Sequence, residues 1–147
     1  MAISADDRNV YLTGLSVAIL TRALDTGDLT QRAGRSGCVQ PVRVPGCALG
    51  RPLLDVEGLA ISPDGANVYV TVFASGALDV FDRAGSTGAL RQKPGRPGCF
   101  TTGALRGCTR ARGGVRGVSS AVVSPDGKHL YAVANLSNSL TAFRITP

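Results

Sequence analysis

The chain has 147 residues, 44% of them hydrophobic, and a formal net charge of +6. This composition is too apolar for a disordered chain and suffices for one domain with a core. No apolar run approaches the roughly 20 residues that cross a bilayer, and the first residues lack the basic-then-apolar pattern of a signal peptide. Nineteen glycines and eight prolines indicate many tight turns between short elements, as in all-β chains.

One unit is repeated along the chain with a period of roughly 60 residues, which is typical of architectures whose copies stack on one another. The three copies open with Ser4-Ala5-Asp6-Asp7-Arg8-Asn9-Val10-Tyr11, Ser62-Pro63-Asp64-Gly65-Ala66-Asn67-Val68-Tyr69 and Ser124-Pro125-Asp126-Gly127-Lys128-His129-Leu130-Tyr131. We therefore expect residues 1–57, 58–117 and 118–147 to form three successive units of one domain.

The first copy, 1–57, departs from the pattern at two places. Asp7 stands where the other copies have the turn glycines Gly65 and Gly127. The segment from Tyr11 to Arg22 is also shorter than its counterpart from Tyr69 to Arg83. A trimmed hairpin and a non-glycine turn residue predict that this unit is degenerate.

The second copy, 58–117, shows the expected elements most clearly, with a period of two rather than 3.6. A short apolar strand over 58–62 meets the turn Pro63-Asp64-Gly65, which predicts a β-hairpin. Two further strands are expected at 67–73 and 77–82, and a shorter, more polar strand at 89–93 suits an exposed edge. Four antiparallel strands per unit make the blade of a β-propeller.

The third copy, 118–147, reaches only its third strand, over 139–144. The predicted fold class is therefore all-β: a β-propeller segment of about two and three-quarter four-stranded antiparallel blades, fewer than the four to eight that close a ring. Two explanations stay open. Either the remaining blades belong to a longer chain, of which this one is a fragment, or a homo-oligomer closes the ring. Open blade faces are expected to associate.

The order of motifs in the second copy resembles the YVTN-type repeats of bacterial β-propellers. These motifs are Ser62-Pro63-Asp64-Gly65, Asn67-Val68-Tyr69-Val70, Leu78-Asp79-Val80-Phe81-Asp82-Arg83 and Thr87-Gly88 followed by Leu90. The resemblance covers nearly the whole chain and implies the architecture of lactonase-like, seven-bladed propellers. It is specific for fold and not for activity, because such blades also occur in surface-layer and other secreted binding proteins.

The four cysteines each follow a glycine and recur with the repeat, as Cys38 with Cys47 and Cys99 with Cys108. Internal symmetry favours these two disulfides among three possible connectivities, each closing a loop between the last strand of one blade and the first of the next. A site for a metal ion is the rival interpretation, but zinc sites prefer about two to four residues between cysteines. Disulfides would place the protein in the cell envelope or outside the cell.

Basic residues are concentrated in one part of the chain. From Arg83 to Arg116 there are eight basic residues and no acidic one. Such a segment could bind a polyanion, and the candidate residues are Arg96, Arg106, Arg110, Arg112 and Arg116. A solvated face is the plainer interpretation, and nucleic acid is disfavoured because Phe100 is the only aromatic residue there.

Catalytic and metal-binding residues are few, so we expect no catalytic site, no metal and no cofactor. The only histidine, His129, matches Asn9 and Asn67 of the other copies and is expected in a turn. One aspartate per turn, as at Asp64, is far below the six to eight oxygen ligands that calcium takes.

Two functions remain open. The first is a non-enzymatic segment of an exported bacterial propeller that acts as a scaffold or binding surface for a protein or a polyanion. The second is part of a lactonase-like, 6-phosphogluconolactonase-type hydrolase whose active site lies mostly in other blades.

Overall fold

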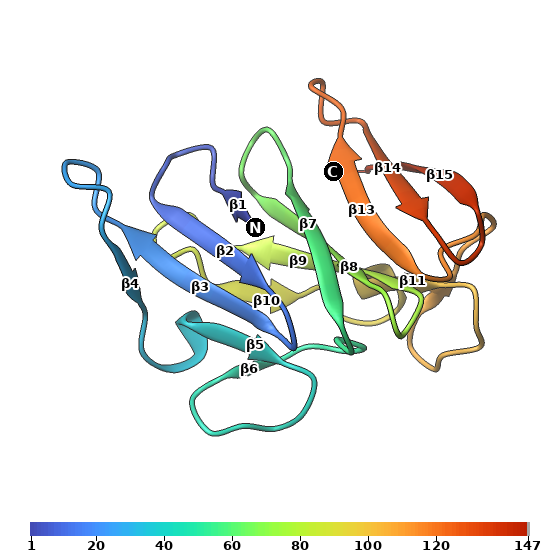
Figure 1. Ribbon diagram of the computed structural model, residues 1–147, viewed down its shortest axis with the longest axis horizontal. Helices are drawn as coiled ribbons and strands as arrows, with labels where there is room; N and C mark the ends of the chain where they lie inside the picture. Colours follow the sequence, from blue (N-terminus) through green and yellow to red (C-terminus); the bar gives the residue numbers. More distant parts are fainter. Residues whose placement is uncertain (147) are drawn as a thin grey trace.

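The computed structural model describes residues 1–146, which form three sheets of mainly antiparallel strands side by side (Figure 1). We call these sheets blades 1, 2 and 3. Pro147, with which the expected third unit ends, lies outside the described residues. No helix among residues 1–146 is long and apolar enough to cross a membrane.

The blades follow one another along the chain. Blade 1 contains β1 (Ala2–Ile3), β2 (Asn9–Thr13), β3 (Val17–Arg22), β4 (Leu29–Gln31), β5 (Cys38–Gln40) and β6 (Ala48–Leu49), with a 3-10 turn, η1, at Gly34–Ser36. Blade 2 contains β7 (Val56–Ile61), β8 (Asn67–Val72), β9 (Ala77–Arg83), β10 (Leu90–Gln92), β11 (Cys99–Thr101) and β12 (Thr109–Arg110), with η2 at Arg96–Gly98. Blade 3 contains β13 (Val118–Val123), β14 (His129–Ala134) and β15 (Ser139–Arg144).

The hairpin that opens each blade is built by its Ser-x-Asp turn. The Ser62 hydroxyl donates to the Asp64 carboxylate at 2.5 Å and accepts a hydrogen bond from the Asn67 amide at 2.9 Å. Gly65 follows with a φ of 68°, in the left-handed region that favours glycine. Asp7 adopts the same conformation, with a φ of 58°, so blade 1 keeps this turn without its glycine.

The outer edge of blades 1 and 2 differs in detail from four simple strands. In blade 2, β10 and β11 both pair with β9, so η2 divides the fourth strand into two pieces. A fifth strand, β12, then pairs parallel to β11. Blade 1 repeats this arrangement with β4, β5 and β6.

The two expected disulfides are formed, Cys38 with Cys47 and Cys99 with Cys108. Each joins the second piece of the fourth strand to the residue that precedes the parallel fifth strand. The expectation that the disulfides close connections from one blade to the next is therefore wrong. They fasten the outer edge within one blade, because the chain adds its parallel strand before it crosses over.

The core lies between the blades, and alternation along β8 decides which side chain faces which neighbour. Val68, Val70 and Val72 are fully buried and pack with Tyr11 and other side chains of blade 1. The intervening Tyr69 belongs to a second cluster that includes Leu130 of blade 3. Since one unit cannot bury both faces of its own sheet, each blade is stabilised by its neighbours.

Candidate functional site: a cationic groove between blades 1 and 2

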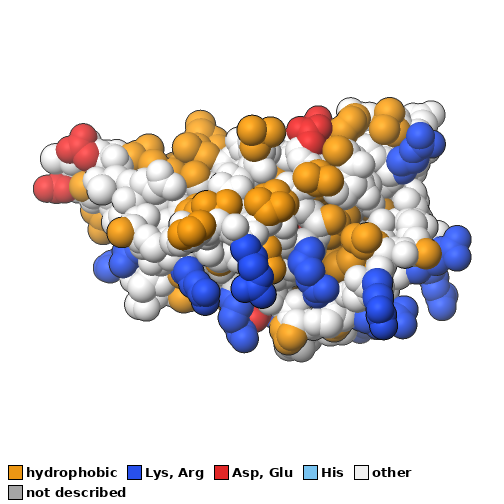
Figure 2. Space-filling model, turned by 90° about the horizontal axis from the view of Figure 1, so that it is seen from below, with side chains coloured by type: hydrophobic (Ala, Val, Ile, Leu, Met, Phe, Trp, Pro, Cys, Tyr) orange, Lys and Arg blue, Asp and Glu red, His pale blue; other side chains and the backbone are white. Residues whose placement is uncertain are grey.

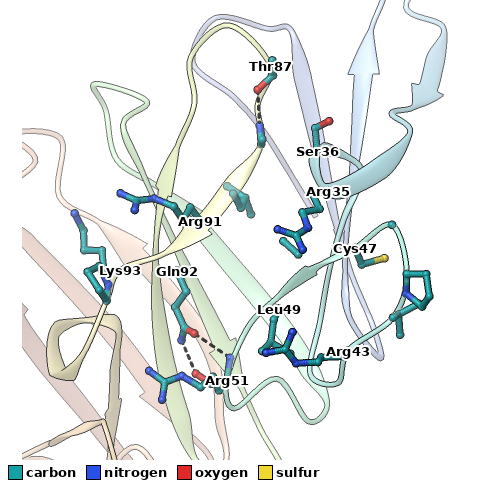
Figure 3. Close-up of a pocket in the computed structure, with 17 residues that line it drawn as sticks. Arg35, Ser36, Arg43, Cys47, Leu49, Arg51, Thr87, Arg91, Gln92 and Lys93 are labelled. Atoms are coloured by element: carbon teal, nitrogen blue, oxygen red, sulfur yellow. Dashed lines mark hydrogen bonds between the residues drawn. The ribbon is translucent and has the colours of Figure 1, made fainter.

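A groove of about 970 Å³ lies where the disulfide loop of blade 1 faces β10 of blade 2 (Figure 3). Its walls carry five cations and, among the described residues that line it, no carboxylate; the cations are Arg35, Arg43, Arg51, Arg91 and Lys93. Lys and Arg side chains also gather along the face of the molecule seen from below (Figure 2). The surface at this joint therefore attracts anions.

The five cations differ in how free they are. The Lys93 ammonium lies 2.6 Å from the Asp82 carboxylate, and the Arg91 guanidinium lies 3.3 Å from it. Arg35 and Arg43 are exposed and make no hydrogen bond or ion pair through their side chains to any described residue. Arg51 is likewise exposed and its side chain makes no such contact, so these three arginines are the ones available to an incoming anion.

The groove has a firm base because Gln92 joins the two blades. The Arg51 amide donates to Gln92 Oε1 at 3.0 Å, while Gln92 Nε2 donates to the carbonyls of Arg51 and, at 3.0 Å, of Gly98. On the blade 1 side, the disulfide at Cys47 holds the wall that carries Arg43. These contacts hold the backbone that carries the cations in place before a ligand arrives.

A buried carboxyl group lies on β9 of blade 2. Asp79 is fully buried, and neither of its carboxylate oxygens has a hydrogen-bond partner among the described residues. Burial raises the pKa of Asp79 well above its usual range, and the charge of Arg51 opposes this only in part. The matching residue of blade 3, Thr141, donates its hydroxyl hydrogen to the Gly114 carbonyl at 2.8 Å.

The residues proposed from sequence for polyanion binding do not line this groove. Arg96, Arg106, Arg110, Arg112 and Arg116 are all exposed, on the outer edge of blade 2 and the connection to blade 3. Sequence reasoning missed Arg35, Arg43 and Arg51. A signal was present, since Arg35 precedes Cys38 at the distance at which Arg96 precedes Cys99.

His129 is exposed and is the first residue of β14, so it begins a strand and does not lie inside the turn as expected. Within residues 1–146, no group of three or more His, Cys, Asp and Glu side chains is placed to hold a metal ion.

The chain resembles solved structures, while no protein-family model and no curated protein matches it. A protein from Lactobacillus plantarum aligns with a TM-score of 0.69 and 16% identity, over 99% of this chain and 36% of that one. A periplasmic gluconolactonase from Pseudomonas aeruginosa aligns with a TM-score of 0.64 and 23% identity, over 99% of this chain and 36% of that one. The fold is a partial β-propeller.

The hydrazine synthase of Kuenenia stuttgartiensis also shares the propeller fold, with a TM-score of 0.58 and 16% identity over 99% of this chain and 44% of that one. This propeller segment spans between 34% and 44% of the length of such structures. Because the activities named for these proteins differ and the identities are low, the likeness concerns the fold and not the activity.

Proposed function

We propose that this chain is a non-enzymatic propeller segment of an exported bacterial protein, and that it binds acidic ligands in the groove between blades 1 and 2. Two disulfides support an oxidising location, because cytosolic thiols are kept reduced. The YVTN-type motifs support a role as a binding scaffold.

The observation that carries the proposal is the groove itself, with five cations and no carboxylate among its described lining residues. Guanidinium groups donate paired hydrogen bonds to carboxylate, sulfate and phosphate oxygens. The groove has no aromatic side chain in its described lining, so it lacks the stacking platform of a nucleic-acid site. An acidic polysaccharide, with regularly spaced charges and no bases, is the ligand class that fits.

Binding of heparin and of polygalacturonate to the full chain tests this proposal. We expect measurable affinity that falls as salt rises. Arg35→Ala combined with Arg43→Ala should weaken binding about tenfold or more, since each removes a charge-assisted hydrogen bond. The matched control is Arg96→Ala with Arg106→Ala, which removes two exposed arginines from the corresponding edge of blade 2.

The control pair should change the affinity by less than about threefold. If the control pair abolishes binding and the groove pair does not, the polyanion site lies on blade 2, where the sequence first suggested it. If neither polymer binds, the proposed function is wrong.

A second candidate is a share in a lactonase-like hydrolase, favoured by the likeness to the periplasmic gluconolactonase. Hydrolysis of glucono-δ-lactone by the chain above the buffer rate would support it and would overturn the non-enzymatic proposal.

A further inference from the structure

The joint between blades 1 and 2 contains an arginine that enters a set of acceptors on the preceding blade. The Arg83 guanidinium, from the end of β9, lies 2.9 Å from both carboxylate oxygens of Asp6. Its Nε donates to the Tyr11 hydroxyl at 2.8 Å and its Nη2 to Asn9 Oδ1 at 2.8 Å. We call Asp6, Asn9 and Tyr11 the socket of blade 1.

A backbone hydrogen bond identifies the position of this arginine in every blade. The amide of Arg83 donates to the Ala66 carbonyl at 2.8 Å, and the amide of Arg22 donates to the Arg8 carbonyl at the same distance. In blade 3 the corresponding donor is Ile145. Arg22 is therefore the counterpart of Arg83, and Ile145 replaces the arginine at the joint between blades 2 and 3.

Arg22 lies at the end of β3, on the face of blade 1 that blade 2 does not cover. Its neighbour Thr21 pairs with Asn9, whose side chain contacts blade 2. Because side chains alternate along a strand, Arg22 projects from the opposite, open face of blade 1. Its guanidinium makes no hydrogen bond to any residue among 1–146. Ile3 and Leu12 are exposed in the same blade, at 54% and 36%.

Blade 3 presents a socket of the same kind on its own open face. Asp126 and Tyr131 stand at the positions of Asp6 and Tyr11, with His129 in place of Asn9. The Asp126 carboxylate accepts hydrogen bonds from the Ser124 hydroxyl at 2.6 Å and from the Lys128 amide at 3.0 Å, so it is already oriented. In blade 1 the Ser4 hydroxyl holds Asp6 in the same way.

An apolar surface surrounds the socket of blade 3. Leu140 is 68% exposed and Val122 is 60% exposed, whereas Leu78, the counterpart of Leu140 in blade 2, is 1% exposed because blade 3 covers it. The open face of blade 3 therefore leaves large apolar side chains exposed where blade 2 has its counterpart covered.

We propose that a second copy of this chain docks its blade 1 on blade 3, so that its Arg22 enters the socket of Asp126 and Tyr131. The arginine and its acceptors lie on opposite ends of one chain, which makes the contact head-to-tail. Two copies would supply six blades, within the range of closed propellers. The inference deepens the proposed scaffold function, because a closed ring would hold two cationic grooves.

Charge reversal provides a sharp test by sedimentation velocity. The native chain should self-associate, while Arg22→Asp and Asp126→Arg each place like charges together and should weaken association at least about tenfold. An equimolar mixture of the two variants should associate again. In a mixed pair, one contact joins Arg22 to Asp126 and the other joins the two reversed residues.

Matched substitutions distinguish the loss of the socket contact from the loss of the turn aspartate itself. Asp126→Asn should weaken association, whereas Asp64→Asn, in the same turn of blade 2 but opposite Ile145, should not. Circular dichroism of each variant shows that it is folded. A native chain that stays monomeric at about 100 μM, or folded variants whose mixture does not associate, would overturn the inference. Polyanion binding measured on the same variants tests the proposed function separately, because Arg22 and Asp126 do not line the groove.

Discussion

Arg83 of blade 2 lies with its guanidinium 2.9 Å from the Asp6 carboxylate of blade 1, although only 4% of the Arg83 side chain is exposed. A cation so far removed from water needs acceptors, and it finds them in Asp6, Asn9, Tyr11 and the Gly65 carbonyl. At the next joint, Ile145 occupies the matching position and belongs to the apolar cluster between blades 2 and 3. The two joints are thus held by different chemistry.

Arg83→Ala should lower the free energy of unfolding by about 2–3 kcal/mol, because it removes the hydrogen bonds that the guanidinium donates to the Tyr11 hydroxyl and the Asp6 carboxylate across the joint. This lies at the low end for a buried pair, since Asp6 is 38% exposed. Urea denaturation of the two proteins measures the difference. Arg91→Ala is the control: its side chain is 79% exposed, so it should change stability by less than about 0.5 kcal/mol. An equal loss in both variants would show that the Arg83 contacts do not stabilise the joint.

The joint should also weaken in acid. Hydrogen bonds from Ser4 and then from Arg83 lower the pKa of Asp6 from 3.8 to about 2. Since the folded pKa lies below the unfolded one, the stabilisation is present above about pH 4 and is lost as the pH falls through 2. We expect a loss of about 1 kcal/mol, small because the carboxylate is partly exposed. Unfolding followed from pH 6 to pH 2 should show this slope in the native chain and a flatter one in Asp6→Asn; parallel slopes would contradict it.

The buried Asp79 has the opposite pH dependence. Burial raises the folded pKa of Asp79 well above 3.8, so the folded chain holds this proton more tightly than the unfolded chain. Stability should fall as the pH rises above about 4, up to the folded pKa.

Asp79→Thr, which introduces the residue found at the matching position 141 of blade 3, should therefore stabilise the chain at pH 7 by about 1–3 kcal/mol and have little effect below pH 4. Thermal unfolding at the two pH values measures it. Asp82→Thr is the control, because the carboxylate of Asp82 pairs with Lys93 and its loss should not stabilise. If Asp79→Thr destabilises the chain more at pH 7 than below pH 4, the carboxyl group has a partner that it prefers in its charged form.

The two disulfides should differ in their effect on ligand binding. Cys38→Ser with Cys47→Ser, and Cys99→Ser with Cys108→Ser, should each cost about 2–3 kcal/mol in stability, because both bridges close loops of similar length. Only the first pair borders the cationic groove. Its loss should weaken heparin binding several-fold, while the second pair leaves the affinity unchanged. Equal affinities in the two folded variants would show that the groove does not depend on its disulfide wall.

The repeat by itself determined most of the fold. The recurring Ser-x-Asp turns and the period of two predicted the hairpins, because these features act over a few residues and need no partner to be recognised. The cysteine spacing likewise predicted the two disulfides. The split fourth strand and the parallel fifth strand were not predicted, since short polar segments pair only when a neighbouring edge is present.

The site was decided by the tertiary structure alone. The cluster of arginines that follows Arg83 in the sequence predicted a polyanion site at one edge of blade 2. The groove instead combines Arg35 and Arg43 of blade 1 with Arg91 and Lys93 of blade 2. Electrostatic potential depends on distance in space, and stacking blades brings together charges that are about 50 residues apart in sequence. The same stacking buries Arg83 against Asp6 and leaves its repeat partner Arg22 on an open face, although the two arginines occupy the same position in the repeat.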